Sequence, residues 1–456
     1  MDEKDVRIDQ YLDVHLDGSL AELAALCAQP SVSAQNLGIE ECANLVAEML
    51  KKRGFATEVL PTGGAPVVFG ERKGKSDKTL LFYNHYDVQP GEPLELWESP
   101  PFQPEIRDGV MYARGVVDDK GHFTSRLFAV DALLNANEGE LPCTVKFVLE
   151  GEEETSSLHL HDFVVNNKER LAADACVWEY GGVDHLDQPT QSLGLRGICY
   201  VELSVEIANQ DVHSGLGGSI FPNAAWRLVW ALNTLKDENE RILIPGFYDD
   251  IVPPSDRDLA LLDQLPDPAD QYRAQYGLKG FLKGLTGGVA LKAAQVFEPT
   301  CTICGLTSGY QGPGSKTVLP AKASAKIDFR LVPNQRPEKV LQQLRAHLDQ
   351  HGFDDIQIGF MGGDTPARTD PDDDFVKLAV ETAEEVYQKA VQIEPMSGGS
   401  GPSSIFMEHL NLPVISAGVA HPGAQMHAPN ENMRVDLYLL GAKHIARLIK
   451  RFGDGD

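Results

Sequence analysis

Helical and extended patterns of apolar residues alternate over the first 190 residues. In residues 40–53 the apolar positions Leu45, Val46, Met49 and Leu50 have helical spacing, and the pattern ends at Gly54. Short apolar runs typical of strands lie at residues 55–60, 67–71, 79–83, 144–149 and 173–178, with further helices predicted at 120–134 and 161–170. This alternation predicts an α/β layer with helices on both faces of the sheet.

The pattern changes near Leu195. Two-sided strands are predicted at 200–207, 301–307, 321–331 and 356–360, with helices at 222–235 and 338–351. Their order is β-α-β-β-α-β, the split ferredoxin-like arrangement. Residues 249–270, rich in Asp and Pro, are interpreted as an insertion, and α/β texture returns with a helix at 375–389 and a strand at 413–416. We therefore expect a discontinuous α/β domain, residues 1–194 and 366–456, with an α+β domain inserted at 195–365.

Five of the strand-like runs are followed by side chains that can bind a metal. The pairs are 80–83 with His85 and Asp87, 110–117 with Asp118 and Asp119, 145–149 with Glu152 to Glu154, 175–178 with Glu179, and 412–415 with His427. An isolated acidic triplet is also typical of a solvated helix N-terminus. However, the carboxyl ends of strands in an open α/β sheet form its ligand crevice, and crowded carboxylates repel one another unless cations neutralise them. The repeated arrangement predicts a metal site.

Charge and cysteine content limit the class of protein. With 40 basic and 67 acidic residues the net charge is −27, so nucleic acid and anionic membranes are not expected partners. No apolar stretch approaches the roughly 18 residues that span a bilayer, and the N-terminus lacks the pattern of a signal peptide, so we expect a cytoplasmic protein. Seven cysteines do not form a disulfide framework. Cys301 and Cys304 lie three apart in a predicted strand, on opposite faces, and are interpreted as unlinked thiols.

The residue types at the strand ends are those of a two-metal hydrolytic centre. Such a centre needs several anionic ligands, one of them bridging, and it lowers the pKa of a water and polarises a carbonyl. The candidate ligands are His85, Asp118, Glu154, Glu179 and His427. His, Asp and Glu without thiolates suit zinc, cobalt or manganese. Glu153 is the candidate general base, and Asp87 is placed to reach the second imidazole nitrogen of His85.

Seven segments give the chain a family resemblance. They are 85–90 (HYDVQP), 97–102 (WESPPF), 115–121 (GVVDDKG), 150–155 (EGEEET), 211–215 (DVHSG), 329–334 (FRLVPN) and 427–431 (HAPNE). In this order they resemble the M20 metallopeptidase family, which also includes aminoacylases and the deacylases of acetylornithine and succinyl-diaminopimelate. The resemblance implies a zinc-exopeptidase-like mixed sheet flanked by helices, with the inserted domain serving as a lid and dimerisation domain.

The resemblance also implies roles for the predicted site residues. Asp118 would bridge two divalent ions, expected to be Zn²⁺ with Co²⁺ or Mn²⁺ as alternatives, and the Asp118–Asp119 peptide would be cis. One ion would add His85 and Glu179, and the other Glu154 and His427. Glu153 would take the water proton and pass it to the leaving amine. Because Glu152 is also acidic, the base and the ligand could alternatively lie one residue earlier, at Glu152 and Glu153. Glu179 stands at a position where the dipeptidase branch usually carries Asp.

Further residues are assigned by the same resemblance to substrate recognition. His213 would reach into the partner subunit's site and stabilise the tetrahedral oxyanion, with a simple turn histidine beside Gly215 as the alternative. Arg330 would hold a substrate carboxylate, with a structural salt bridge to Asp328 as the alternative. Gly399 and Ser400 would offer donors to the substrate. His15, His122, His159 and His161 are interpreted as surface or capping residues.

These observations favour a metal-dependent exopeptidase, most similar to a cytosolic dipeptidase, that works as a homodimer paired through the sheet edge of the inserted domain. An N-acyl-amino-acid deacylase is the alternative within enzymes, because residues 394–397 (EPMS) depart from the dipeptidase pattern, which often has Arg there. An inactive relative that serves as a binding or assembly module is disfavoured by the intact base and ligands. A two-metal phosphoesterase would require more basic residues near the centre than Lys120.

Overall fold

The computed structural model describes residues 2–455, which form two compact units. Unit 1 comprises residues 1–193, 369–394 and 405–456, and unit 2 comprises residues 194–368 and 395–404. Residues 395–404, placed with the first domain by the sequence pattern, thus belong to unit 2. Each unit is described separately below.

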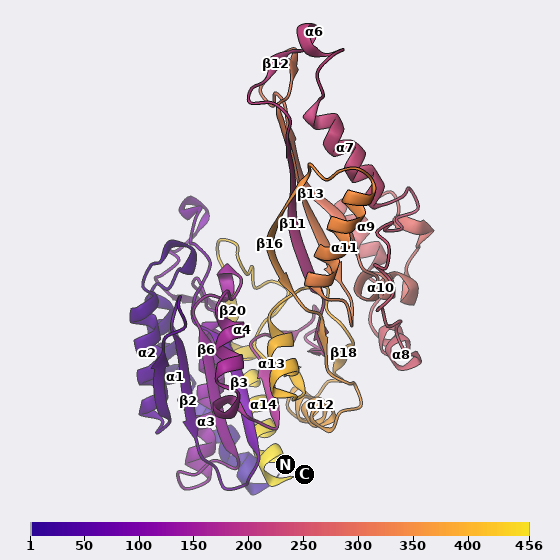
Figure 1. Cartoon of the computed structure of the whole chain (residues 1–456). Helices are drawn as coiled ribbons and strands as arrows, with labels where there is room; N and C mark the ends of the chain where they lie inside the picture. Colours follow the sequence, from indigo (N-terminus) through magenta and orange to yellow (C-terminus); the bar gives the residue numbers. More distant parts are fainter. Residues whose placement is uncertain (1, 456) are drawn as a thin grey trace. The chain divides into compact units, whose positions relative to one another are not determined.

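Unit 1 is built on a six-stranded mixed sheet in the order β1-β2-β6-β3-β7-β19 (Figure 1). Its strands are β1 (Ala56–Leu60), β2 (Val67–Arg72), β3 (Thr79–His85), β6 (Thr144–Glu150), β7 (Ala175–Trp178) and β19 (Val414–Ser416). Strands β6, β3, β7 and β19 are parallel to one another. They are buried on both faces, which explains the continuous apolar run from Leu80 to Tyr83. Their carboxyl ends lie at the same edge of the sheet.

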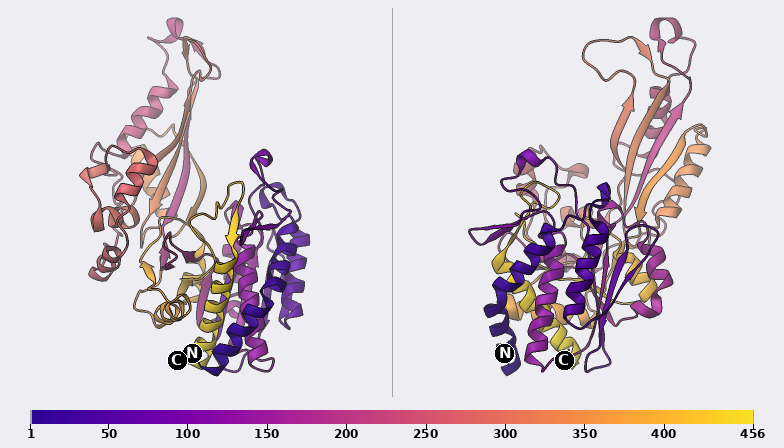
Figure 2. Two further views of the ribbon diagram at one scale, coloured as in Figure 1. Left: turned by 180° about the vertical axis from the view of Figure 1, so that it is seen from behind. Right: turned by 90° about the vertical axis from the view of Figure 1, so that its left-hand side faces the viewer.

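Helices cover both faces of this sheet, as the alternating sequence pattern predicts (Figures 1 and 2). The helices that share a core with one face are α1 (Glu3–Ala28), α2 (Ile39–Lys52), α3 (Lys120–Ala136), α12 (Asp374–Tyr387) and α14 (Val435–Asp454). On the other face α4 (Leu160–Asn166) and α13 (Ser403–Leu410) pack against β3, β6 and β7. Phe406 from α13 lies against the stacked rings of Tyr83 and Trp178 there. The prediction of a mixed α/β sheet flanked by helices is confirmed.

The prediction of one strand over residues 110–117 is wrong. Only β5 (Val110–Tyr112) is extended, and it lies in a separate sheet of the order β20-β5-β4, with β20 (Asn432–Arg434) and β4 (Glu105–Arg107). Residues 113–118 form a turn that leads into α3. The helix predicted over 161–170 is also divided, into α4 and α5 (Lys168–Leu171). A third sheet joins β18 (Gln392–Glu394), β9 (Pro189–Ser192) and β8 (Gly182–Val183).

Unit 2 contains the β-α-β-β-α-β order that its sequence predicts. The strands β11 (Gly197–Glu206), β13 (Thr302–Ser308), β15 (Lys322–Leu331) and β16 (Gln357–Asp364) form one antiparallel sheet in the order β13-β15-β11-β16. Helices α7 (Ala224–Leu235) and α11 (Pro337–Gln350) pack on it through an apolar core that includes Val201, Leu228 and Leu344. The ferredoxin-like arrangement is confirmed, and β13 is an edge strand.

Shorter elements complete unit 2. They are β10 (Gly194–Leu195) with β17 (Ala367–Arg368), β12 (Val212–His213) with β14 (Val318–Leu319), and the helices α6 (Ser214–Gly217), α8 (Asp256–Gln264), α9 (Ala269–Tyr276) and α10 (Gly288–Phe297). The predicted insertion at 249–270 holds α8, whose start is capped by Ser255 and Asp258. Cys301 is buried and Cys304 is exposed, and all seven cysteines are free thiols, as expected.

Between residues 2 and 455, no helix combines the length and the apolar character needed to cross a membrane.

Candidate metal centre

The carboxyl edge of the unit 1 sheet brings together residues that are far apart in the sequence. His85 is the last residue of β3, and Glu179 directly follows β7. Strand β6 ends at Glu150, and the chain then forms a 3-10 turn at Glu153–Thr155. Asp118 lies in the turn before α3, and its peptide bond to Asp119 is cis, as the resemblance implies. His427 comes from a loop, with a left-handed φ of 61°.

The carboxylate of Asp118 lies between two imidazoles. Its Oδ1 is 3.1 Å from Nε2 of His85, and its Oδ2 is 2.9 Å from Nε2 of His427. His427 Nε2 is also 3.3 Å from Oε2 of Glu154. Ligand atoms of Asp118, Glu154 and His427 all lie within 4.8 Å of one another. One carboxylate therefore joins the two histidines that the sequence assigns to two different ions.

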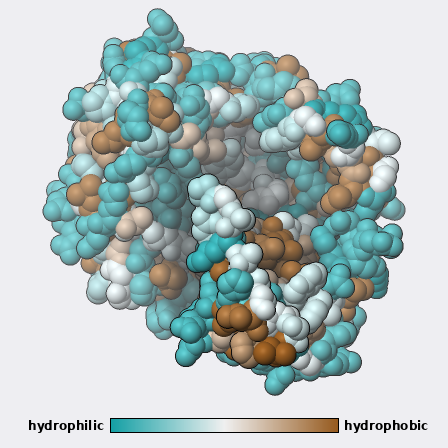
Figure 3. All heavy atoms as spheres, turned by 90° about the horizontal axis from the view of Figure 1, so that it is seen from above, coloured by the Kyte–Doolittle hydropathy of each residue, from teal (hydrophilic) through white to brown (hydrophobic). Residues whose placement is uncertain are grey.

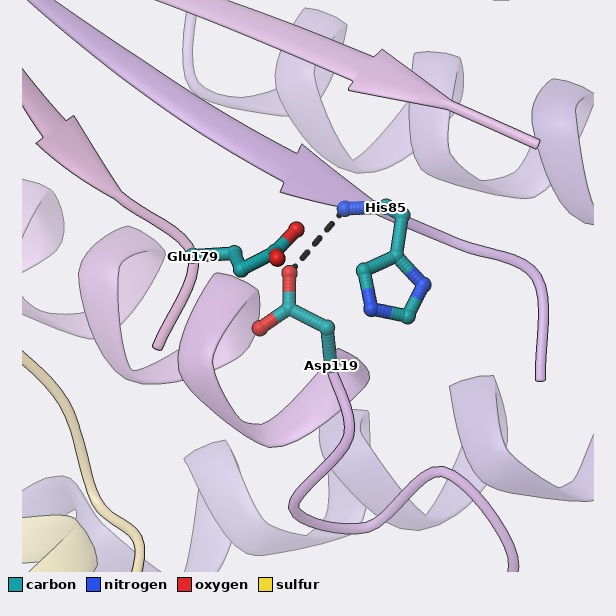
Figure 4. Close-up of side chains that lie close together, drawn as sticks. All are labelled: His85, Asp119 and Glu179. Atoms are coloured by element: carbon teal, nitrogen blue, oxygen red, sulfur yellow. Dashed lines mark hydrogen bonds between the residues drawn. The ribbon is translucent and has the colours of Figure 1, made fainter. Parts of the chain in front are cut away.

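A second group of ligand atoms, from His85, Asp119 and Glu179, also lies within 4.8 Å (Figure 4). Figure 4 shows the carboxylates of Glu179 and Asp119 pointing toward one another, with the ring of His85 beside Asp119. Oδ2 of Asp119 accepts hydrogen bonds from the backbone N–H of His85, at 3.0 Å, and from Nδ2 of Asn84, at 2.6 Å. Asp119 is therefore anchored beneath β3 by these donors.

The three consecutive glutamates divide between two environments. Glu152 pairs with His159, whose Nδ1 lies 2.7 Å from Oε2. Glu154 is almost fully buried and contacts His427 as described. Burial raises the pKa of Glu153, and the charges that act on it next are those of His85, Asp118, Asp87 and His427. Its carboxylate thus faces the same cluster, whereas Glu152 is engaged elsewhere.

The cluster holds more negative charge than its side chains balance. Burial, followed by repulsion from Glu153, raises the pKa of Glu179 well above its usual range. Burial and Asp118 raise the pKa of Glu154 to about 7. Burial would also raise the pKa of Asp118, but hydrogen bonds from His427 and His85 outweigh it and hold that pKa well below its usual range. The same hydrogen bond to Asp118 raises the pKa of His427 to about 9.

The donor set fits divalent metal ions. Oε2 of Glu179 and Oδ1 of Asp119 are buried without a hydrogen-bond partner among the described residues. Buried polar atoms are normally paired, so such atoms mark a place where an ion or water belongs. Carboxylate oxygens and imidazole nitrogens are ligands of zinc and of harder divalent ions. A divalent cation would also offset the burial and the repulsion that together raise the pKa values of the glutamates.

Asp87 contacts both the ring of His85 and the glutamate turn. Nδ1 of His85 is 3.0 Å from the backbone carbonyl of Asp87, while the carboxylate Oδ1 lies at 3.4 Å. The carboxylate also accepts the backbone N–H groups of Glu153, at 3.2 Å, and Glu154, at 3.1 Å. Asp87 therefore holds the His85 ring through its backbone and the glutamate turn through its side chain.

Glu431 is a supporting residue whose role sequence reasoning missed. Its buried carboxylate accepts four hydrogen bonds: Oε2 from Nη1 of Arg114 (2.7 Å) and N–H of Gly115 (3.0 Å), and Oε1 from N–H of Val117 and Asp118 (both 3.1 Å). These donors fix the turn that carries Asp118. The sequence does show an acidic residue, Glu431, four residues after the candidate ligand His427. However, nothing in the sequence links Glu431 to residues 114–118.

Two other supporting residues lie below the strand ends. The buried Arg126 of α3 donates to the carbonyls of Tyr83, Glu179 and Ala417, next to three of the parallel strands. His122 is buried as well, with its nitrogens 2.6 Å from the carbonyl of Val117 and 3.1 Å from that of Gly181. The interpretation of His122 as a surface or capping residue is wrong, because α3 is covered on all sides.

Unit 2 carries the residues predicted to recognise substrate. Nη1 of Arg330 donates to Oγ of Ser400 at 2.9 Å, and Nε donates to Asp328 at 3.0 Å, which is the salt bridge of the alternative interpretation. Gly399 is exposed and its carbonyl accepts the N–H of Arg196. His213 is exposed, and its Nδ1 accepts the N–H of Gly215. Its Nε2 lies 3.4 Å from Oγ1 of Thr317.

Substitution of Glu431 tests the anchoring of Asp118. Glu431→Gln places an amide N–H₂ against donors and leaves at least one of them unpaired, so we expect divalent-ion affinity to fall about 10- to 100-fold, as for other residues that orient a ligand. The measurement is competition with a chelator of known affinity. Asp258→Asn is the matched control, since Asp258 is a buried acid that contacts Arg368 in unit 2. A folded Glu431→Gln protein with unchanged ion affinity would contradict the assignment.

Comparison with known proteins agrees with this geometry. Residues 81–451 match the profile of peptidase family M20/M25/M40. The Beta-Ala-His dipeptidase of Homo sapiens is 29% identical over 370 residues, which cover 75% of this chain and 71% of the relative. The Cys-Gly metallodipeptidase DUG1 of Candida albicans is 28% identical over 469 residues, covering 95% and 94%. The crystal structure of an M20 family metallo-carboxypeptidase, Sso-CP2 from Sulfolobus solfataricus, superposes with a TM-score of 0.90 at 36% identity and full coverage of both chains. The chain therefore belongs to peptidase family M20/M25/M40, whose members are hydrolases that use divalent metals.

Proposed function

We propose that the protein is an exopeptidase that hydrolyses dipeptides or short peptides with a free carboxylate, using two divalent ions at the carboxyl edge of the unit 1 sheet. The observation that carries the proposal is the Asp118 carboxylate, which contacts His85 and His427 through its two oxygens. His85 and Glu179 would hold one ion, and Glu154 and His427 the other. The ions are expected to be Zn²⁺, with Co²⁺ or Mn²⁺ as alternatives.

Asp118 is a better bridging ligand than its neighbour Asp119. The two oxygens of Asp118 face different imidazoles, as a bridging carboxylate requires. In contrast, Oδ2 of Asp119 already accepts two hydrogen bonds, so only its Oδ1 is left for an ion, whereas a bridging carboxylate needs both oxygens. We therefore assign Asp119 the role of orienting the Asp118 turn and the His85 backbone.

The chemistry follows from the charges around Glu153. Two bound ions lower the pKa of a water and polarise the scissile carbonyl. Glu153 faces the cluster and has a raised pKa, because it is buried and close to Asp118, so it is suited to accept a proton. It then passes that proton to the amine that leaves when the C–N bond breaks. Asp87 holds the backbone of Glu153 in place for both transfers.

Recognition of a free carboxylate is assigned to unit 2. Arg330 is one-third exposed, and its contacts to Ser400 and Asp328 orient the guanidinium while its second terminal nitrogen stays available for a substrate. A guanidinium suits a carboxylate because it donates parallel hydrogen bonds. The exposed Gly399 and the Ser400 hydroxyl supply further donors. A peptide whose C-terminus is blocked would lose these interactions.

A homodimer paired through unit 2 completes the proposal. The edge strand β13 exposes Ile303 and Leu306, each by more than half of its surface. The end of unit 2 that carries α6 and β12 faces the viewer in Figure 3, where brown apolar residues gather among polar ones, and Leu216, Ile220 and Phe221 are exposed on this part of the chain. An unpaired edge and exposed apolar residues favour pairing with a second copy. His213, exposed at β12, would then stabilise the oxyanion in the partner's site.

Two sets of relatives support this choice of substrate. The dipeptidases of Homo sapiens and Candida albicans act on dipeptides by their names, and Sso-CP2 is described as a carboxypeptidase. Both activities cleave next to a free C-terminal carboxylate. Seven free thiols are consistent with the reducing cytoplasm, which is the proposed compartment.

A substrate panel tests the function. Protein reloaded with Zn²⁺, Co²⁺ or Mn²⁺ is assayed on dipeptides, their C-terminal amides, longer peptides and N-acetyl amino acids. We expect ion-dependent cleavage of free dipeptides and at least a tenfold loss of kcat/KM on the amides. Cleavage of N-acetyl amino acids alone would make the protein a deacylase, and no turnover with ions bound would make it a binding module.

The role of Glu153 is tested by Glu153→Ala. We expect unchanged ion stoichiometry and a loss of kcat of about 10²–10⁴-fold, the range for removal of a general base. Glu152→Ala is the matched control, because Glu152 contacts His159 rather than the cluster, and it should keep most of its activity. Loss of an ion together with activity in Glu153→Ala would make Glu153 a ligand instead.

The role of His213 in the partner's site is tested by complementation. His213→Ala and Glu153→Ala chains are each expected to be inactive, yet their heterodimer contains one site with both an intact Glu153 and an intact His213. Mixed and re-associated chains should therefore regain part of the activity, whereas each variant re-associated with itself should not. A mixture that forms heterodimers, as shown by a size tag on one chain, and stays inactive would contradict the assignment.

A further inference from the structure

His161 and His409 face one another on the surface of unit 1. Their Nε2 atoms are 3.3 Å apart, and the ring planes meet at 74° with centroids 5.1 Å apart. His161 is well exposed and His409 is half-buried. Neither residue has a role in the proposed hydrolysis.

The distance between the two nitrogens is that expected of two ligands on one ion. A zinc–imidazole bond is about 2.0–2.1 Å long, and at a tetrahedral angle two such nitrogens lie about 3.3–3.4 Å apart. A direct N–H···N hydrogen bond is the competing explanation. In that case 3.3 Å is longer than the typical hydrogen-bond length of about 2.9–3.0 Å, and at an exposed position water would compete for both nitrogens.

The neighbour of His161 prepares its ring for a metal. Nδ1 of His161 is 3.0 Å from Oδ1 of Asp162. A carboxylate accepts a hydrogen bond from the protonated ring nitrogen, so Nδ1 carries the proton and the lone pair stays on Nε2, the atom that faces His409. This is the carboxylate–histidine arrangement that orients metal ligands and raises their basicity.

The helices that carry the two histidines form a fixed frame. α4 carries His161 and α13 carries His409. Both helices share one apolar core, which includes Leu160 and Phe163 from α4 and Phe406 from α13. The two rings therefore meet because both helices pack on the same core, and their separation does not depend on a flexible loop.

The surrounding charges allow a cation to bind. Asp162 and Glu408 supply negative charge, and Lys168 is the cation that acts on His409. Burial, and then Lys168 and His161, lower the pKa of His409, which favours the neutral ring that binds a metal.

We propose that His161 and His409 form a separate surface site for a borderline divalent ion such as Zn²⁺, Ni²⁺ or Cu²⁺. Water fills the remaining positions, and Asp162 orients the first ligand. The chain enters unit 1 from unit 2 within α13, between residues 404 and 405. A bound ion thus cross-links this connecting helix to α4, which follows the Glu153–Thr155 turn.

The first experiment is retention of the untagged, ion-loaded protein on immobilised Ni²⁺. Two histidines that chelate one ion retain a protein more strongly than single exposed histidines do, so His161→Asn and His409→Asn should each elute at a clearly lower imidazole concentration. His185→Asn is the matched control, since His185 is as exposed as His161 but has no histidine partner, and it should elute with the wild type. Identical elution of all four proteins would overturn the proposal.

Equilibrium dialysis against Zn²⁺ supplies the second readout. The wild type should bind one more equivalent than His161→Asn, His409→Asn or the double variant, and Asp162→Asn should weaken that last equivalent about tenfold. Circular dichroism and peptidase activity confirm that each variant is folded. Equal stoichiometry in wild type and folded His161→Asn would show that the two rings form only a hydrogen bond.

Discussion

The main constraint on unit 1 is that four acidic side chains lie close together at one edge of its sheet. Asp118, Glu153, Glu154 and Glu179 converge there, and the neighbouring groups that can carry positive charge are His85, His427 and the buried Arg126. Burial, together with repulsion among these acids, raises the pKa values of the three glutamates. The acids lie close together because parallel strands end at the same edge of the sheet. Divalent ions resolve the conflict, so the fold makes ion binding and charge balance a single requirement.

Neutralising the charge of these acidic side chains would not by itself position them for catalysis. Three of the five proposed ligands are positioned by a hydrogen bond to the backbone: Glu431 acts on the Asp118 turn, Asp87 on the backbone of Glu154 and Asp119 on that of His85. Because these supporting acids accept N–H groups, they fix backbone rather than side-chain rotamers. A rigid backbone then limits where a ligand can move when a substrate replaces water. The supporting contacts therefore fix the geometry of the site, while the proposed ligands themselves bind the ions.

Much of this could be predicted from the sequence, for physical reasons that also mark the limits. Strand β3 and the position of His85 follow from an uninterrupted apolar run, which only a strand buried on both faces tolerates. Residues 110–117 look similar but form a short strand and a turn, because apolar side chains can also be buried by a turn beneath a helix. The contacts of Asp87, His122 and Glu431 connect residues through backbone atoms, which the identity of side chains does not encode. The assignment of 395–404 to unit 2 likewise depends on long-range packing.

The two units carry different parts of the proposed function, hydrolysis in unit 1 and substrate recognition in unit 2. The groups proposed for water chemistry belong to unit 1, whereas Arg330, Ser400, Gly399 and His213 belong to unit 2. The chain passes between the units after residues 193, 368, 394 and 404, so the short segment 395–404 is joined to unit 1 at both of its ends. Residues 394–397, which depart from the dipeptidase pattern, lie at one of these crossings. In the proposed function, a change there would alter the segment that carries Gly399 and Ser400, whereas the hydrogen bonds that hold Asp118 and Glu153 lie within unit 1. Substrate preference could therefore change without loss of the proposed hydrolytic centre.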